Sequence, residues 1–188
     1  MYPHSPTGEY RLLLYMVIQK TKHDGCYVYT LGSGQPPSHI GCADDKQLMT
    51  SPESVFFRGS LHWHTNTMIM VFDTTNESFW QMHSPMVSAD DHFEMSDMLG
   101  MFCFNEKENI VDIWVMKDYE GEVWALQRWV KLPIAEIVEQ FETSRSWFDL
   151  VAASWDGDML LLIQFEDNWL LQVDMDSKLI ANIHKRFL

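Results

Sequence analysis

The sequence has few cysteines and no long apolar run. Its three cysteines, Cys26, Cys42 and Cys103, are an odd number without a Cys-x-x-Cys pair, so they form no disulfide framework and favour a reducing compartment. The first apolar run, at 12–18, has seven residues, too few for a membrane span, and residues 1–8 carry no basic cluster of the kind that begins a signal peptide. We therefore expect a protein of the cytoplasm or the nucleus.

Basic residues are also scarce, because 13 Lys and Arg stand against 27 Asp and Glu, a formal net charge of −14. Such a surface repels phosphate backbones and anionic lipids, so we expect neither nucleic acid nor membrane as a partner. It favours a basic protein partner, since opposite charges speed association. The 188 residues, 46% hydrophobic and 21% charged, suffice for one domain over 1–188 with its own core, and they exclude disordered, collagen-like and coiled-coil chains.

Short apolar runs separated by turn residues follow one another, which is the pattern of an all-β protein. Asp24-Gly25 predicts a hairpin between strands at 10–18 and 26–31. Further units repeat a glycine-led strand, a hairpin, a strand that ends in an acidic turn, and one more strand. The glycines are 41 and 57 residues apart and the turn aspartates 45 and 56, at Gly59, Gly100 and Gly157 and at Asp73, Asp118 and Asp174.

These spacings overlap the roughly 40–50 residues of a four-stranded propeller blade. We therefore predict an all-β, propeller-like (kelch-like) array of about four short antiparallel sheets, whose eight Trp and eleven Phe supply aromatic side chains between the layers. A Greek-key sandwich, which also has short strands at regular intervals, is the alternative. Apolar residues at 134, 137, 138 and 141 behind Pro133 predict one short amphipathic helix near 133–141.

His62-Trp63-His64 is the best metal-like constellation, because alternate residues of a strand point to one face and both imidazoles could meet one ion. A third ligand would have to come from elsewhere, for instance His83 or His92. Polar residues on the outer face of a strand explain the pair equally well. We expect no metal and no other cofactor.

Four pairs of carboxylates could serve as the acid and base of a hydrolase: Asp44 with Asp45, Asp90 with Asp91, Asp156 with Asp158, and Asp174 with Asp176. Each pair falls in a predicted turn, where Asp is favoured because it bonds its own backbone. The sequence has no G-x-S-x-G, P-loop or G-x-G-x-x-G motif. We predict no catalytic residues and no enzyme, and the alternative is a small acidic hydrolase or metal-dependent enzyme on a β scaffold.

Five stretches in a fixed order carry a family resemblance, at 27–33, 57–63, 71–74, 100–102 and 111–119. Together they resemble the F-box-associated domain of plant F-box proteins, grass ones in particular, over about residues 10–133. Residues 157–162 with Val173-Asp174 fit the closing unit of that domain.

The resemblance implies a protein-interaction module, the part of an SCF-type E3 ubiquitin ligase receptor that recognises the substrate. In such receptors a helical F-box ahead of the domain docks a Skp1-type adaptor and a cullin. Nothing in this sequence matches an F-box, and we expect the first strands of the domain to be absent too. The adaptor and cullin are then partners only if an F-box is supplied elsewhere, and the chain is a truncated receptor or a competitor for the ligand.

Irregular loops are where we expect the protein ligand, because propeller-like folds present their loops as binding faces. The longest is at 84–97, and within it Asp90, Asp91, His92 and Phe93 are the candidate partner-binding residues. A second loop lies at 32–41, and a plain solvated connection is the alternative for both. If the first sheet is incomplete, the edge of the strand at 10–18 should lie unpaired or be covered by a neighbouring chain.

Overall fold

The computed structural model describes residues 1–16, 25–41, 54–65, 68–85, 91–95, 98–141, 148–155, 158–165, 169–173, 176 and 179–185. In these residues sixteen strands and one helix form, and the strands make four antiparallel sheets of four strands each. This confirms the predicted all-β, propeller-like array of about four sheets with one short helix. The Greek-key alternative is wrong for these sheets, because the neighbours in every sheet are consecutive strands and each sheet is therefore a meander.

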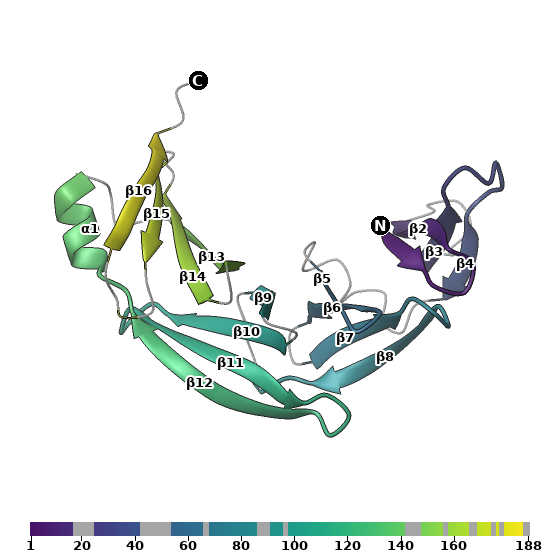
Figure 1. Ribbon diagram of the computed structural model, residues 1–188, viewed down its shortest axis with the longest axis horizontal. Helices are drawn as coiled ribbons and strands as arrows, with labels where there is room; N and C mark the ends of the chain where they lie inside the picture. The colour runs from purple at the N-terminus through teal and green to yellow at the C-terminus, as the bar shows by residue number, and fades with distance from the viewer. Residues whose placement is uncertain are drawn as a thin grey trace. The chain divides into compact units, whose positions relative to one another are not determined.

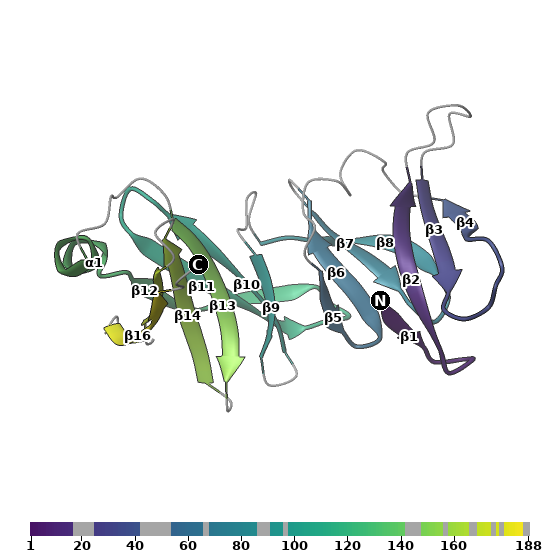
Figure 2. The same cartoon turned by 90° about the horizontal axis from the view of Figure 1, so that it is seen from above.

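Two compact units divide the chain, Met1–Val87 and Ser88–Leu188. The first unit holds two sheets, and Figure 2 shows β2, β3 and β4 of the first sheet side by side. The first sheet consists of β1 (Tyr2–His4), β2 (Glu9–Met16), β3 (Gly25–Thr30) and β4 (Ser38–Gly41). The second sheet consists of β5 (Val55–Phe57), β6 (Ser60–His64), β7 (Met68–Asp73) and β8 (Ser78–His83).

The second unit holds the other two sheets and the helix (Figure 1). Its third sheet consists of β9 (Asp91–Met95), β10 (Met98–Asn105), β11 (Ile110–Asp118) and β12 (Val123–Lys131). After α1 (Ile134–Phe141) the fourth sheet follows with β13 (Phe148–Trp155), β14 (Asp158–Phe165), β15 (Trp169–Val173) and β16 (Leu179–Lys185). That residues 1–188 act as a single domain stays a prediction.

Each unit has its own apolar core. In the first unit the core joins the two sheets through Tyr2, Val28, Leu61, Trp63, Met70 and Phe72. In the second unit α1 packs with the third and fourth sheets, and Ile134 and Ile137 are buried in the same cluster as Phe102, Val111, Ile163 and Leu171. The helix predicted near 133–141 is therefore confirmed, with the carbonyl of Pro133 accepting its first hydrogen bond, from the amide of Ile137 at 3.0 Å.

Five hairpins among the described residues end their turns in the same way. The last turn residue has a positive φ, and the next residue begins a strand; these turn residues are Gly8 (71°), Gly59 (76°), Glu77 (53°), Asn109 (55°) and Glu122 (53°). Carboxylates hold two of these turns, as predicted: Asp73 Oδ1 accepts from the amides of Thr75 (2.7 Å) and Asn76 (3.1 Å), and Asp118 Oδ1 accepts from the amide of Gly121 (3.2 Å). Asp174 lies outside the described residues, as does Asp24 of the predicted hairpin.

Two expectations about loops are wrong. Residues 84–97 are not one loop, because β9 pairs antiparallel with β10 within them, with Phe93 opposite Gly100. Residues 32–41 end in β4, which pairs with β3. In both cases backbone pairing with a neighbouring strand overrides residues that are poor strand formers, such as Asp91 in β9 and Gly41 in β4. The edge expectation for the strand at 10–18 is met in part. β3 pairs with Arg11–Met16 on one side of β2, whereas on the other side β1 pairs with Glu9–Arg11 only, so Leu12–Met16 have no second pairing strand among the described residues.

Candidate functional site

The predicted metal-like pair lies on β6, but its two imidazoles have different surroundings. His62 is fully buried, with its ring 6.2 Å from that of Phe57, and burial lowers the pKa of His62 to about 4, so the imidazole is neutral at pH 7. His64 Nε2 lies 3.1 Å from the Ser84 hydroxyl. His83 is exposed, and the side chain of His92 lies outside the description. Among the residues with described side chains, no three His, Cys, Asp or Glu gather as metal ligands would.

The predicted carboxylate pairs fall mostly on residues outside the description, which are Asp44, Asp45, Asp90, Asp156 and Asp174. For Asp91 and Asp158 only the strand position is described. Asp176 is exposed and lies 3.9 Å from Arg128 in a loose ion pair. That these pairs belong to turn chemistry stays a prediction.

The candidate partner-binding residues lie on an edge strand rather than in a loop. Asp91, His92 and Phe93 belong to β9, opposite Phe102, Met101 and Gly100 of β10. Asp90 lies outside the described residues. Their role in binding stays a prediction, and it now concerns β9, one of the two edge strands of the third sheet.

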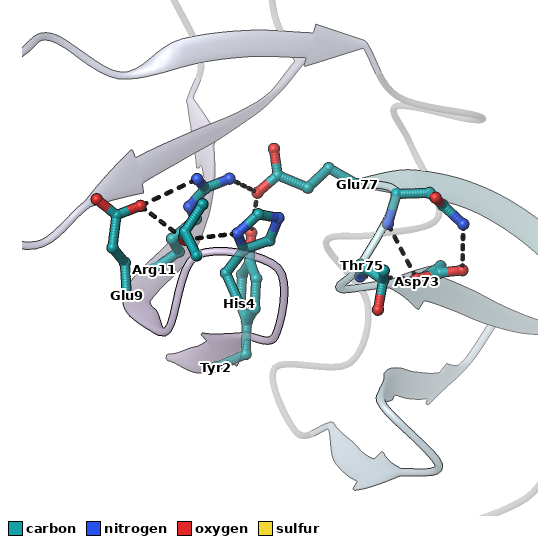
Figure 3. A network of polar contacts seen from close by, with 9 residues as sticks. Tyr2, His4, Glu9, Arg11, Asp73, Thr75 and Glu77 are labelled. Carbon is teal, nitrogen blue, oxygen red and sulfur yellow. Dashed lines mark hydrogen bonds and ion pairs between the residues drawn. The ribbon is translucent and has the colours of Figure 1, made fainter.

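A polar network, which sequence reasoning missed, joins the two sheets of the first unit (Figure 3). One oxygen of Glu77, Oε1, accepts from the Tyr2 hydroxyl at 2.9 Å and from Arg11 Nη1 at 2.5 Å. Arg11 Nη2 donates to Glu9 Oε2 at 3.2 Å, and the same Glu9 oxygen accepts from the Thr7 hydroxyl at 2.8 Å. Glu77 stands on the β7–β8 turn, so a single carboxylate ties that turn to β1 and β2.

The network sets the charge states of its members. Burial, and next the hydrogen bond to Glu77, raise the pKa of Tyr2 above its usual range, so the phenol stays protonated. Burial acts to lower the pKa of Arg11, but hydrogen bonds to Glu77 and Glu9 outweigh it and the net shift is upward. Hydrogen bonds from Thr7 and then Arg11 lower the pKa of Glu9. These residues serve to fasten the two sheets, with Tyr2 only 1% exposed and its ring edge-on to Phe72.

The other face of the first sheet is apolar and partly exposed. Leu12 lies opposite Tyr29 and Leu14 opposite Tyr27, so all four share one face, while Leu13 and Val28 turn to the core. The amide of Leu31 donates a hydrogen bond to the carbonyl of Tyr10 at 3.0 Å and so extends the pairing of β2 with β3 by one residue pair. We call the resulting surface the tyrosine face, and its residues are Tyr10, Leu12, Leu14, Tyr27, Tyr29 and Leu31.

Exposure distinguishes the tyrosine face from the core. Tyr10 is 56% and Leu31 42% exposed, and the other four residues are half-buried. His39 of β4 extends the surface, because its ring lies 4.9 Å from that of Tyr27. A Cβ at Gly25 would stand 2.7 Å from His39 Nε2, so glycine is what leaves room for that ring. The sequence signal for this surface is two strands with apolar residues at both odd and even positions.

Comparison with known proteins decides the family. A family model described as the F-box associated beta propeller domain matches residues 4–171, which covers most of both units. The chain belongs to this family. The resemblance inferred for about residues 10–133 is thereby confirmed and extended in both directions, and no F-box domain is matched. No curated protein and no solved structure matches the chain.

Membership gives the F-box associated domain the character of a protein-interaction module. A surface such as the tyrosine face fits that character, because tyrosine is enriched where proteins bind one another. The only helix among the described residues, α1, has eight residues and is too short to cross a bilayer.

Proposed function

We propose that the chain recognises a protein ligand as the receptor part of an SCF-type E3 ubiquitin ligase, in the cytoplasm or nucleus and without catalytic chemistry of its own. The observation that carries the proposal is the family match over residues 4–171. F-box receptors divide the work between an F-box, which docks the adaptor, and an associated domain, which holds the substrate. The chain supplies the second of these parts.

The tyrosine face supports the proposal as the contact surface in the first unit. Tyrosine offers a large rigid ring and a hydroxyl with few rotatable bonds, so it loses little conformational entropy when a partner covers it. Three tyrosines and three leucines on one face, two of them more than 40% exposed, make an apolar patch of the kind that marks a binding site.

The link to the ligase depends on an F-box. Joined to one, the chain would present its ligand to the ubiquitin-transferring subunits through a Skp1-type adaptor and a cullin. Without one, it would hold the same ligand away from the ligase and act as a competitor.

The test is to express the chain fused behind an F-box in plant cells and to measure protein abundance across the proteome. We expect a small set of proteins to fall in abundance, with recovery when the proteasome is inhibited. The double variant Leu12→Ser, Tyr29→Ser should abolish this fall, because it removes two half-buried apolar side chains at the centre of the tyrosine face.

The matched control is Phe56→Ser, which removes an exposed apolar side chain (41%) from β5 in the second sheet, outside the tyrosine face. It should leave the fall in abundance unchanged. Both variants are first shown to fold by circular dichroism. An unchanged proteome with the fused chain, or an equal fall with the double variant, would count against the proposal.

A further inference from the structure

The outer strand of the third sheet differs from ordinary edge strands. β12 has nine residues, ends the strand order β12-β11-β10-β9, and has no second strand beside it among the described residues. Figure 1 shows it as the outermost of the long strands of that sheet. Proteins usually keep edge strands short or place charged side chains on them. β12 is long, and two large apolar side chains are exposed on it, Leu126 at 47% and Trp129 at 60%.

A β-bulge brings these two side chains to one face. Leu126 lies opposite Trp114 and Trp129 opposite Asp112, and the register shift between them leaves Gln127 as the extra residue. Because Asp112 and Trp114 are two apart on β11, all four side chains share a face. The exposed indole of Trp129 therefore lies opposite the carboxylate of Asp112, and the apolar pair Leu126 and Trp114 is the next pair along the two strands on that face. We call Asp112, Trp114, Leu126 and Trp129 the β12 patch.

Charge is divided unequally between the two units. The first unit has 5 Lys and Arg against 7 Asp and Glu, a formal charge of −2, and the second has 8 against 20, a formal charge of −12. The β12 patch thus lies on the strongly acidic unit. Arg128 lies on the opposite face of the sheet and pairs with Asp176. Lys131 shares the face of the patch, but it forms no ion pair with Asp112 in the described part of the chain.

We propose that the β12 patch binds an extended, basic segment of a partner protein. An arginine or lysine side chain of the segment stacks on Trp129 and pairs with Asp112, where the ring face and the carboxylate attract the same cation. An apolar side chain two residues along the segment covers Leu126 and Trp114, because that spacing matches the patch. The inference rests on the proposed function, since it names the partner chemistry of an interaction module.

A second copy of the chain fits this patch less well. Two second units brought together would each carry −12, and their repulsion opposes a dimer through β12. The same charge attracts a basic segment and speeds its encounter with the patch. Charge complementarity therefore selects a basic partner as the occupant.

The test uses the full chain and three fluorescein-labelled ten-residue peptides on a Ser/Thr background. The first places Arg and Leu two residues apart, the second places them next to each other, and the third replaces Arg by Glu at the first spacing. By fluorescence anisotropy in low salt, we expect the first peptide to bind at least fivefold more tightly than the others. Its binding should weaken as salt rises.

Variants locate the binding. Trp129→Thr should weaken the first peptide about tenfold and Asp112→Asn about threefold, in keeping with exposed cation–π and ion-pair contacts. Lys131→Gln should strengthen it two- to threefold, because it removes a competing cation from the face. Phe56→Ser, on β5 of the second sheet and outside both proposed surfaces, is the matched control and should leave the binding of the first peptide unchanged. If Trp129→Thr fails to fold, the inference is still tested by the other two variants, because Asp112→Asn should weaken the binding of the first peptide and Lys131→Gln should strengthen it.

Equal binding of the three peptides, or binding that ignores both Asp112→Asn and Lys131→Gln, would overturn the inference. So would a dimer of the free chain that Trp129→Thr converts to a monomer in sedimentation. This assay needs no F-box and no ligase. Peptide binding without any effect in the abundance assay would therefore refute the proposed function alone, and the reverse result would refute the β12 patch alone.

Discussion

Glu77 holds its carboxylate against Tyr2 and Arg11 while its own backbone has a φ of 53°. A non-glycine residue in this left-handed region costs roughly 1 kcal/mol. The cost is offset because the carboxylate satisfies two donors on the first sheet, and the Tyr2 hydroxyl is largely shielded from water. Glu77 is thus the residue through which the β7–β8 turn stabilises the contact between two sheets.

Glu77→Gly should therefore destabilise the first unit even though glycine relieves the backbone. Losing hydrogen bonds to a charged acceptor costs about 1–2 kcal/mol here, after allowance for the partial exposure of Arg11 and Glu77. Asn109→Gly is the control, because Asn109 has the same backbone conformation (φ 55°) in a turn of the second unit. It should change the free energy of unfolding by less than about 0.5 kcal/mol. Urea unfolding measures both, and a Glu77→Gly chain as stable as the native one would show that the network contributes nothing.

His62 makes stability depend on pH. Its pKa is about 4 in the folded chain against 6.5 for the ordinary side chain, because burial disfavours the imidazolium. As pH falls, the unfolded chain takes up this proton first, so the contribution of His62 is complete above about pH 6.5 and is lost on the way down to pH 4. A shift of this size corresponds to about 3 kcal/mol.

The measurement is the free energy of unfolding at several pH values between 4 and 7, in the native chain and in His62→Gln. Glutamine is polar and does not titrate, so the variant should lose the part of the slope that belongs to His62. Other histidines and the carboxylates titrate in both proteins and cancel in the difference. Identical slopes would mean that His62 is protonated equally in the folded and unfolded chains.

At the scale of elements, α1 is held by its apolar stripe. Ile134 and Ile137 are buried in the core of the second unit, while Glu136 faces solvent. Ile137→Ala should destabilise the second unit by about 2–4 kcal/mol, because it deletes buried methyl and methylene groups and leaves a cavity. The control Glu136→Ala should stay within about 0.5 kcal/mol. Thermal unfolding distinguishes them, and equal melting temperatures would show that α1 contributes little to that core.

Elements that depend on local chemistry could be predicted from the sequence. The turns at Asp73 and Asp118 follow from carboxylates that bond amides two or three residues on, and α1 follows from its 3.6-residue period behind Pro133. β1 and β9 could not be predicted in this way. Pro3 in one and the acidic residues of the other disfavour a strand, and it is the pairing with β2 and β10 that makes them strands.

The surfaces needed the tertiary structure. Tyr2 and Glu77 are 75 residues apart, and no local pattern connects them. The β12 patch depends on a bulge at Gln127, which decides that Leu126 and Trp129 share a face although a regular strand would place them on opposite ones. The tyrosine face could have been predicted in part from the sequence. β2 and β3 have apolar residues on both faces, and the core of the first unit uses only one of these faces.

At the scale of the whole molecule, charge and apolar surface are distributed differently between the two units. The nearly neutral first unit carries the tyrosine face, and the acidic second unit carries the β12 patch. Apolar burial gives affinity, whereas complementary charge gives speed and selectivity. A protein-interaction module with both surfaces can hold one ligand by burial and attract basic segments by charge.

The most direct test of this account is a quantitative co-purification of the chain from plant cells, beside the double variant Leu12→Ser, Tyr29→Ser and the control Phe56→Ser. Skp1-type adaptor, cullin and all other retained proteins are measured by mass spectrometry. The account predicts that the chain and the control retain the same few proteins without the adaptor, and that the double variant loses them. Retention of the adaptor by the unmodified chain, or the same set of retained proteins with the chain and both variants, would contradict it.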